Sequence, residues 1–157
     1  MTTKTQLQTK IQELEAELSS FKQQLNNDKD HPTIQEAAVG DVLEDGCIVL
    51  QKENGLALLV APQSTDVFCS WTKDFREVFK KLEEQGFNPS QFFIPTKEQL
   101  NFAYKTIPQH FASTCYWSST EVSATSACVQ NFSGGNIFSS SSKTFTFCVR
   151  AFRCVTY

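Results

Sequence analysis

Apolar side chains in the first 27 residues recur at alternating intervals of four and three, which is the heptad pattern of a coiled-coil helix. Gln, Lys and Glu fill many of the remaining positions, and these residue types favour helix. We therefore expect residues 1–27 to form a helix that brings copies of the chain together. The expected oligomerisation seam consists of Leu7, Ile11, Leu14, Leu18, Phe21 and Leu25.

Charged residues beside this seam face residues of opposite charge when two chains lie parallel and in register. With Ile11 at heptad position a, the pairs Lys10–Glu15 and Glu17–Lys22 fall at g and the following e. The pattern predicts a parallel homo-oligomer. Leucine at both a and d does not settle the number of strands, and a trimer is favoured over a dimer. The alternative is a single amphipathic helix packed on its own domain.

A change of period marks the start of a second domain. Residues 28–39 are mostly polar, and Pro32 prevents a simple continuation of the helix, so a linker is expected there. From Gly40 onward the apolar pattern has a period of two. Two β-rich runs flank Asn54-Gly55, which is a strong signal for a β-hairpin. The domain is expected to cover residues 40–157.

Two helices are predicted between the strand-rich segments of this domain. The first covers about residues 73–85, has one apolar face and stops at Gly86. The second covers about residues 97–106, where Thr96 and Gln99 have the spacing of a capping box. Strands, two helices and strands again indicate an α+β fold.

The last 43 residues, from Cys115 to Tyr157, have an unusual composition. They contain nine serines, five threonines and five phenylalanines, but only four charged residues. Two alternating runs within the stretch are typical of strands, and the polar segments between them are typical of loops. Hydroxyl and aromatic groups on display indicate a binding surface and not an active site.

Five segments occur in the order found in a known family: GCIVLQKENGLALLVAP, FFIPTKEQLNFAYKTI, YWSSTE, NFSGG and VRAFR. On these segments, residues 40–155 resemble the C-terminal-domain family of the Legionella collagen-like adhesin Lcl. That family has a C-type-lectin-like fold and occurs in bacterial surface proteins and phages. The resemblance implies a C-type-lectin-like domain behind the N-terminal helix.

The resemblance assigns most of the matching residues to architecture. It implies that Trp117 is a buried anchor and that the hydroxyls of residues 118–120 satisfy nearby backbone groups. Phe132, Val149, Arg150 and Phe152 belong to the same architectural set. Ligand binding is expected in the segments between these anchors, at about 121–128 and 136–147. The candidate ligand-binding residues are Glu121, Ser123, Thr125, Asn136, Phe138, Ser140, Ser142, Phe145 and Phe147.

Departures from the family suggest a further hypothesis. Relatives tend to carry Tyr, Trp or Asn at exposed positions where this chain has Cys128, Phe145, Phe147, Cys148 and a run of serines. Ser, Phe and Cys codons are one base away from Tyr codons. Because lectin-like domains of this kind are targets of diversity-generating retroelements, the loops are hypothesised to be diversified.

Charge and motif content argue against several other functions. The net charge of −3 provides no basic footprint for nucleic acid, and no apolar run approaches the roughly 20 residues needed for membrane insertion. No cofactor motif occurs. Calcium needs several oxygen ligands, but Glu121 is the only acid after Thr114. Neither metal binding nor calcium-dependent sugar binding is expected.

The six cysteines do not have the spacing of a metal site, since no CxxC pair occurs and neither histidine lies at ligand spacing. Free thiols are expected, with a Cys115–Cys154 disulfide as the alternative for an extracellular protein. No histidine lies near Cys148 or Cys154 in the sequence to activate a thiol, so no catalytic role is expected.

Two classes of function fit these features. The favoured one is a non-enzymatic virion surface protein, a phage fibre or capsid decoration, whose heads bind a host cell-surface glycan or protein. Its N-terminal helix would also contact other virion proteins. The polar N-terminus lacks a secretion signal, so assembly in the host cytoplasm is expected. The alternatives are a bacterial surface or secreted adhesin with the same head, and a purely structural virion component.

Overall fold

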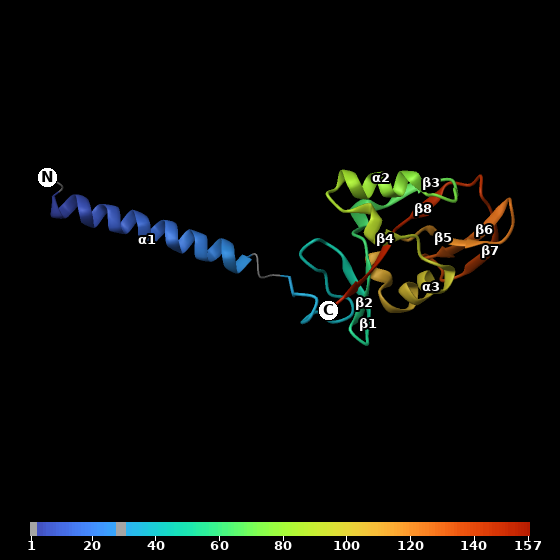
Figure 1. Ribbon diagram of the computed structural model, residues 1–157, viewed down its shortest axis with the longest axis horizontal. Coiled ribbons are helices and arrows are strands. Elements are labelled where there is room, and N and C mark those ends of the chain that lie inside the picture. Colours follow the sequence, from blue (N-terminus) through green and yellow to red (C-terminus); the bar gives the residue numbers. More distant parts are fainter. Residues whose placement is uncertain (1–2, 28–30) are drawn as a thin grey trace. The chain divides into compact units, whose positions relative to one another are not determined.

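The computed structural model describes residues 3–27 and 31–157 of the chain, with side chains for 3–24 and 31–157 (Figure 1). Two compact units make up the chain, Met1–Pro32 and Thr33–Tyr157. The second unit, called the head below, contains two β-sheets and two α-helices. It is an α+β domain, as the alternation of strand and helix patterns predicts.

The first unit contains one helix, α1, which spans Lys4–Asn27. Thr3 and Gln6 cap its start, because each side chain accepts a hydrogen bond from the other residue's backbone N–H, at 3.3 and 2.9 Å. The apolar side chains of its seam, from Leu7 to Phe21, are 53–64% exposed. The side chain of Leu25 lies outside the described residues. The predicted helix is therefore present, and its seam is exposed along the described part of the chain.

The head begins inside the segment predicted to be a linker, so the boundaries 28–39 are too wide. Ala37 is 3% exposed and belongs to the core, and Ile34 packs against it. The ammonium group of Lys52 donates to three carbonyls of this segment at 2.9–3.1 Å. These tertiary contacts hold a segment that contains a turn at residues 34–36 and has no apolar periodicity of its own. Residues 28–30 lie outside the described residues.

The first sheet is antiparallel throughout and has the strand order β1-β2-β9-β4. Asn54 and Gly55 join β1 to β2 with positive φ angles of 52° and 76°, which a tight hairpin turn requires. The predicted hairpin is confirmed. The strands are β1 Ile48–Glu53, β2 Leu56–Val60, β4 Phe92–Phe93 and β9 Phe152–Thr156.

The second sheet has the order β3-β8-β5-β6-β7, and its one parallel pair is β5 with β8. The stretch that begins at Cys115 supplies every strand of this sheet except β3. The edge strand β7 therefore belongs to the segment of unusual composition. The strands are β3 Val67–Cys69, β5 Cys115–Glu121, β6 Ser126–Asn131, β7 Ile137–Ser142 and β8 Phe147–Val149.

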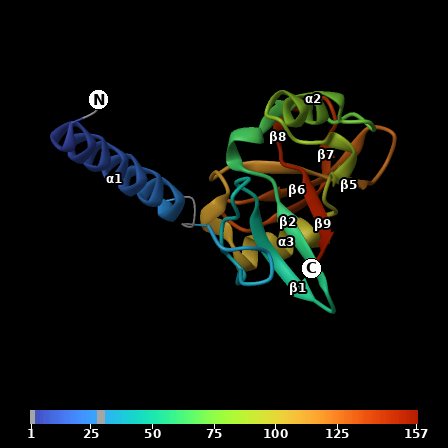
Figure 2. The same cartoon turned by 60° about the vertical axis from the view of Figure 1, so that its left-hand side comes forward.

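Two α-helices pack on these sheets, α2 on β3 and α3 on β5 and β6 (Figures 1 and 2). Helix α3 spans Lys97–Thr106, as predicted. Helix α2 spans Arg76–Glu84 and begins later than the predicted residue 73, because Phe75 precedes it in a left-handed conformation with φ 43° and ψ 43°. Three short 3-10 helices occupy the connections, η1 Gln63–Thr65, η2 Pro89–Gln91 and η3 Pro108–His110.

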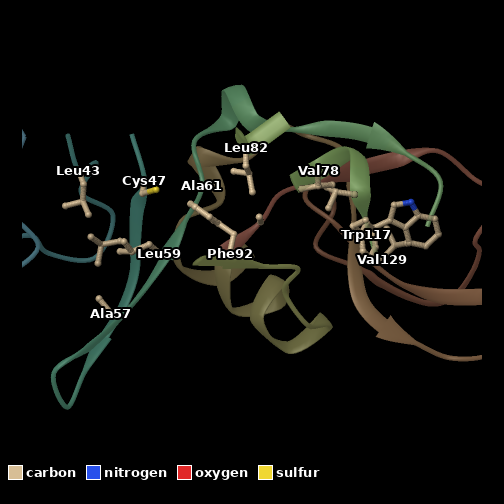
Figure 3. Packing of buried hydrophobic residues seen from close by; sticks show 14 of the residues in the cluster. Leu43, Cys47, Ala57, Leu59, Ala61, Val78, Leu82, Phe92, Trp117 and Val129 are labelled. Carbon is tan, nitrogen blue, oxygen red and sulfur yellow. The ribbon is translucent and has the colours of Figure 1, made fainter. Parts of the chain in front are cut away.

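The core joins both sheets to α2. Figure 3 shows one cluster that runs from Leu43 and Cys47, past Leu82 of α2, to Trp117 and Val129 in the second sheet. A second cluster packs α3 against aromatic side chains of the same sheets. Residues of β5, β6, β8 and β9 belong to these clusters, so the core holds the strands beside the edge strand β7.

The capping box of α3 provides a test of a local sequence signal. Replacing Thr96 with alanine is expected to lower the free energy of unfolding by about 1 kcal/mol. The Thr96 hydroxyl accepts a hydrogen bond from the backbone N–H of Gln99 at 3.2 Å, and alanine leaves that donor unpaired. Urea denaturation followed by circular dichroism measures the change. The control, Thr106→Ala in the last turn of the same helix, keeps the capping bonds, and an equal loss in both variants would contradict the prediction.

Candidate binding surface

The segment YWSST forms the buried foundation of the surface. Trp117 of β5 is 0% exposed, and its indole N–H donates to the carbonyl of Cys69 at 3.0 Å. The hydroxyl of Ser118 donates to the carbonyl of Cys128 at 2.7 Å, so it ties β5 to β6. The hydroxyls of residues 119–120 bond backbone groups at the start of α3. The expected architectural role of this segment is confirmed.

Arg150 has an architectural role as well. Its guanidinium is fully buried and forms a two-bond ion pair with Asp66, at 2.5 and 2.8 Å. It also donates to the carbonyl of His110 at 2.6 Å and lies 4.5 Å from the centre of the Phe111 ring. Tyr116 donates to the same carboxylate at 2.7 Å, and burial raises the pKa of its phenol. This network uses the hydrogen-bonding capacity of Arg150 inside the head.

Lys143 holds together the two loops that carry much of the predicted surface, the loop after β5 and the loop after β7. Its backbone N–H donates to the carbonyl of Thr125 at 2.9 Å, and its ammonium donates to the carbonyl of Ala124 at 3.1 Å. The ammonium lies 3.3 Å from the Glu121 carboxylate and 4.3 Å from the centre of the Trp71 ring. Only 15% of the Lys143 side chain is exposed. It is therefore a structural clamp and not a displayed cation.

The edge strand β7 displays side chains on both of its faces. Its first four residues are exposed, and the exposed fractions of Ile137 and Phe138 are 38% and 45%. The pairing with β6 is interrupted between Ala127 and Val129, where β7 contains one extra residue. Apolar and hydroxyl groups thus stand on a strand that is fixed along one edge only.

Most of the candidate ligand-binding residues are exposed. The loops after β5 and β7 are clamped beside each other, which brings together their predicted residues. Asn136 lies at the opposite end of β7 and is not part of that group. The exposed candidates are Glu121, Ser123, Thr125, Asn136, Phe138, Ser140 and Phe145.

Four residues placed among the exposed positions are not displayed. Phe147 is half-buried and packs edge-to-face on Trp117 with ring centres 4.9 Å apart. Ser142 is half-buried at the end of β7. Cys128 and Cys148 are 1% and 0% exposed. Neighbouring residues of a strand point to opposite faces, and β8 is covered on both: Phe147 packs against one core cluster and Cys148 belongs to the other. The sequence pattern alone does not show that both faces are covered.

A hollow of about 570 Å³ adjoins the Glu121 end of the surface. It brings together three segments that are far apart in sequence: the loop before α2 with the start of that helix, β4 with the residue after it, and the end of β5. We call it the aromatic hollow. It is lined by Trp71, Lys73, Asp74, Phe75, Phe79, Phe92, Phe93, Ile94, Ser119 and Glu121. Of this set, only Glu121 is predicted from the sequence as a ligand-binding residue.

A second hollow, of about 690 Å³, surrounds the ion pair between Asp45 and Arg153, which are 2.6 Å apart. Burial opposes ionisation of Asp45, but the backbone N–H of Cys47 and the Arg153 guanidinium overcome this effect and lower its pKa. Arg153 also lies 5.1 Å from the centre of the Phe92 ring. The two charges therefore bind each other and stabilise the turn before β1.

All six cysteines are free thiols. Burial raises the pKa of Cys47 and Cys148 to about 12 and that of Cys69 to about 11, so these thiols are protonated and poor nucleophiles at neutral pH. Cys115 and Cys154, the pair considered for a disulfide, lie in different sheets.

Metal-binding and membrane-spanning features do not occur in the described residues. Within 3–27 and 31–157, no three His, Cys, Asp or Glu residues are grouped as a metal site requires. No helix of that part of the chain is long and apolar enough to span a bilayer.

No protein-family model matches the chain, and no curated protein matches it.

Proposed function

We propose that this chain is a non-enzymatic virion surface protein, a phage fibre or capsid decoration, whose C-type-lectin-like heads bind a host cell-surface glycan or protein. One observation carries the proposal. Hydroxyl and aromatic side chains are displayed on β7 and on two loops that Lys143 clamps together. The virion setting rests on the resemblance to a family that includes phage proteins.

The stiffness of this surface favours recognition. Ordering a mobile loop on binding costs roughly 0.5–1.5 kcal/mol for each immobilised side chain, so loops already held in place bind at a smaller cost. Phe138 and Phe145 provide apolar area, and Ser140 and Thr125 provide hydrogen-bonding groups. Aromatic and hydroxyl side chains together form adaptable binding surfaces, as they do in antibody loops.

The helix α1 is proposed to assemble the chains as a parallel coiled coil, with three strands favoured over two. Its seam is more than half exposed in one chain, and flanking charges such as Lys10 and Glu15 match between parallel copies. Several weak head contacts then act together, and the gain over a single site is on the order of 10²–10⁴ when the geometry permits. The same helix would contact other virion proteins.

The functional proposal is tested on particles and on cells. Mass spectrometry of purified virions is expected to detect the chain, and a fluorescent full-length chain is expected to bind host cells. Absence from the particles while cell binding persists would favour a bacterial surface adhesin. Presence in the particles without cell binding would favour a purely structural component.

Assembly through α1 has its own test. Replacing Leu18, at heptad position a, with aspartate is expected to raise the dissociation constant of the oligomer more than roughly a hundredfold, since an unpaired buried charge costs about 3 kcal/mol. Sedimentation equilibrium measures the assembly state. The control Ala16→Asp places the same charge at position f on the outer face. If both variants assemble like the parent, the seam does not join the chains.

A further inference from the structure

The aromatic hollow has an apolar floor and a polar rim. Phe79 of α2 and Ile94 after β4 are half-buried, so part of each side chain remains accessible from the hollow. Trp71 adds the edge of its indole, with 8% of the residue exposed. The volume of about 570 Å³ lies within the range of small-ligand sites, roughly 300–1,000 Å³.

The charges on the rim are largely balanced. Glu121 pairs with Lys143 at 3.3 Å, and Asp74 lies 3.6 Å from Arg76. Lys73 adds one exposed ammonium group. This balance favours an uncharged ligand. The two carboxylates would repel an anion, while Lys73 would repel a cation and both acids already have cationic partners.

The rim nevertheless offers hydrogen bonds of both kinds. A carboxylate has about four acceptor sites, so Glu121 and Asp74 retain acceptors beyond their ion pairs. Lys73 donates, and the hydroxyl of Ser119 accepts as well as donates. A ligand that matches this hollow has an apolar face for the floor and several hydroxyl groups for the rim.

We propose that the aromatic hollow binds a neutral saccharide ring, whose C–H face lies against Phe79 and Ile94 while its hydroxyls bond to the rim. The inference rests on the proposed function and adds the class of ligand and the location of its main contact. Glu121 lines the hollow and also pairs with the clamp residue Lys143, so a longer glycan extends from the hollow onto the displayed loops.

A glycan array that carries neutral, acidic and amino-sugar oligosaccharides tests the inference with the full-length chain. Binding is expected to concentrate on neutral oligosaccharides. Phe79→Leu is expected to weaken that binding about three- to tenfold, since an aromatic contact contributes about 0.5–1.5 kcal/mol beyond its area. Leucine keeps most of the apolar volume of the floor. Phe102→Leu is the matched control, because Phe102 is 40% exposed on α3 and does not line the hollow.

A second pair of variants does not depend on core packing. Lys73→Ala removes a donor from the rim and is expected to weaken binding about two- to tenfold, as the loss of one hydrogen bond predicts. Lys80→Ala, at an exposed position of α2, is expected to leave binding unchanged. Thermal unfolding checks that all four variants are folded.

The outcomes separate this inference from the proposed function. Neutral-glycan binding that both hollow variants weaken supports the inference. Glycan binding that neither variant changes overturns it and leaves the displayed loops as the binding site. Preference for acidic or amino-sugar oligosaccharides also overturns it. If the chain attaches to host cells but binds nothing on the array, the saccharide inference is wrong while the recognition function stands.

Discussion

Replacing Trp117 with alanine is expected to lower the free energy of unfolding of the head by about 3–5 kcal/mol. Trp117 is fully buried on β5, which lies between β8 and β6, and its indole donates to the carbonyl of Cys69. Alanine leaves a cavity against Phe147, which packs on the indole ring, and an unpaired backbone carbonyl. A typical domain has only about 5–15 kcal/mol of stability, so much of the head's stability depends on this side chain.

Urea denaturation followed by circular dichroism measures this effect. All variants are compared at one chain concentration, because the proposed assembly of the chains would shift apparent stability. Phe102→Ala is the control, since Phe102 is 40% exposed on α3, and a loss of less than about 1 kcal/mol is expected there. If the two alanine variants unfold at the same urea concentration, Trp117 does not anchor the second sheet.

Breaking the ion pair between Arg150 and Asp66 is expected to have a comparable effect. Arg150→Met is expected to destabilise the head by about 3–5 kcal/mol, because it leaves the largely buried Asp66 carboxylate without its cation. It also removes the donor to the carbonyl of His110. The double variant Arg150→Met with Asp66→Asn is expected to recover part of the loss, since the unpaired charge is then gone.

The control for this experiment is a surface ion pair. Arg76 and Asp74 lie 3.6 Å apart with side chains 87% and 63% exposed, so solvent screens their attraction. Arg76→Met is expected to change stability by less than about 0.5 kcal/mol. The same denaturation measurement applies. An equal effect of the two arginine substitutions would refute the structural role of the buried pair.

Local signals predicted several elements of the fold well. Asn54-Gly55 predicts the first hairpin because the turn needs two residues with positive φ angles, and asparagine and glycine adopt them most easily. Thr96 and Gln99 predict the start of α3 because their side chains cap it within four residues. In both cases the atoms that stabilise the element are neighbours in the chain.

Predictions that depended on distant contacts were less accurate. The sequence pattern predicts too early a start for α2, because the left-handed conformation of Phe75 has no sequence signature. The Phe75 ring packs on Trp71 with ring centres 5.5 Å apart. Ala37 was assigned to a linker, although its burial comes from strands later in the chain. Phe147 was assigned to the displayed set, although it packs on Trp117.

The candidate surface also has features that local sequence signals predict and features that depend on distant contacts. The sequence identified the stretch after Cys115 and most of its exposed side chains, because composition and alternation are properties of the segment itself. The sequence did not identify the ion pair between Asp66 and Arg150, because these two residues are 84 positions apart in the chain. Only the fold shows that Lys143 clamps two loops.

By itself, the sequence determined an N-terminal heptad helix, an α+β head and the segment that carries the displayed groups. Periodicity, turn residues and caps act over a few residues, so they can be recognised without a structure. The tertiary structure alone decided which side of each strand is buried, which acid pairs with Arg150 and where the aromatic hollow lies. These features depend on contacts between residues far apart in the chain, and one residue's position along a strand does not specify them.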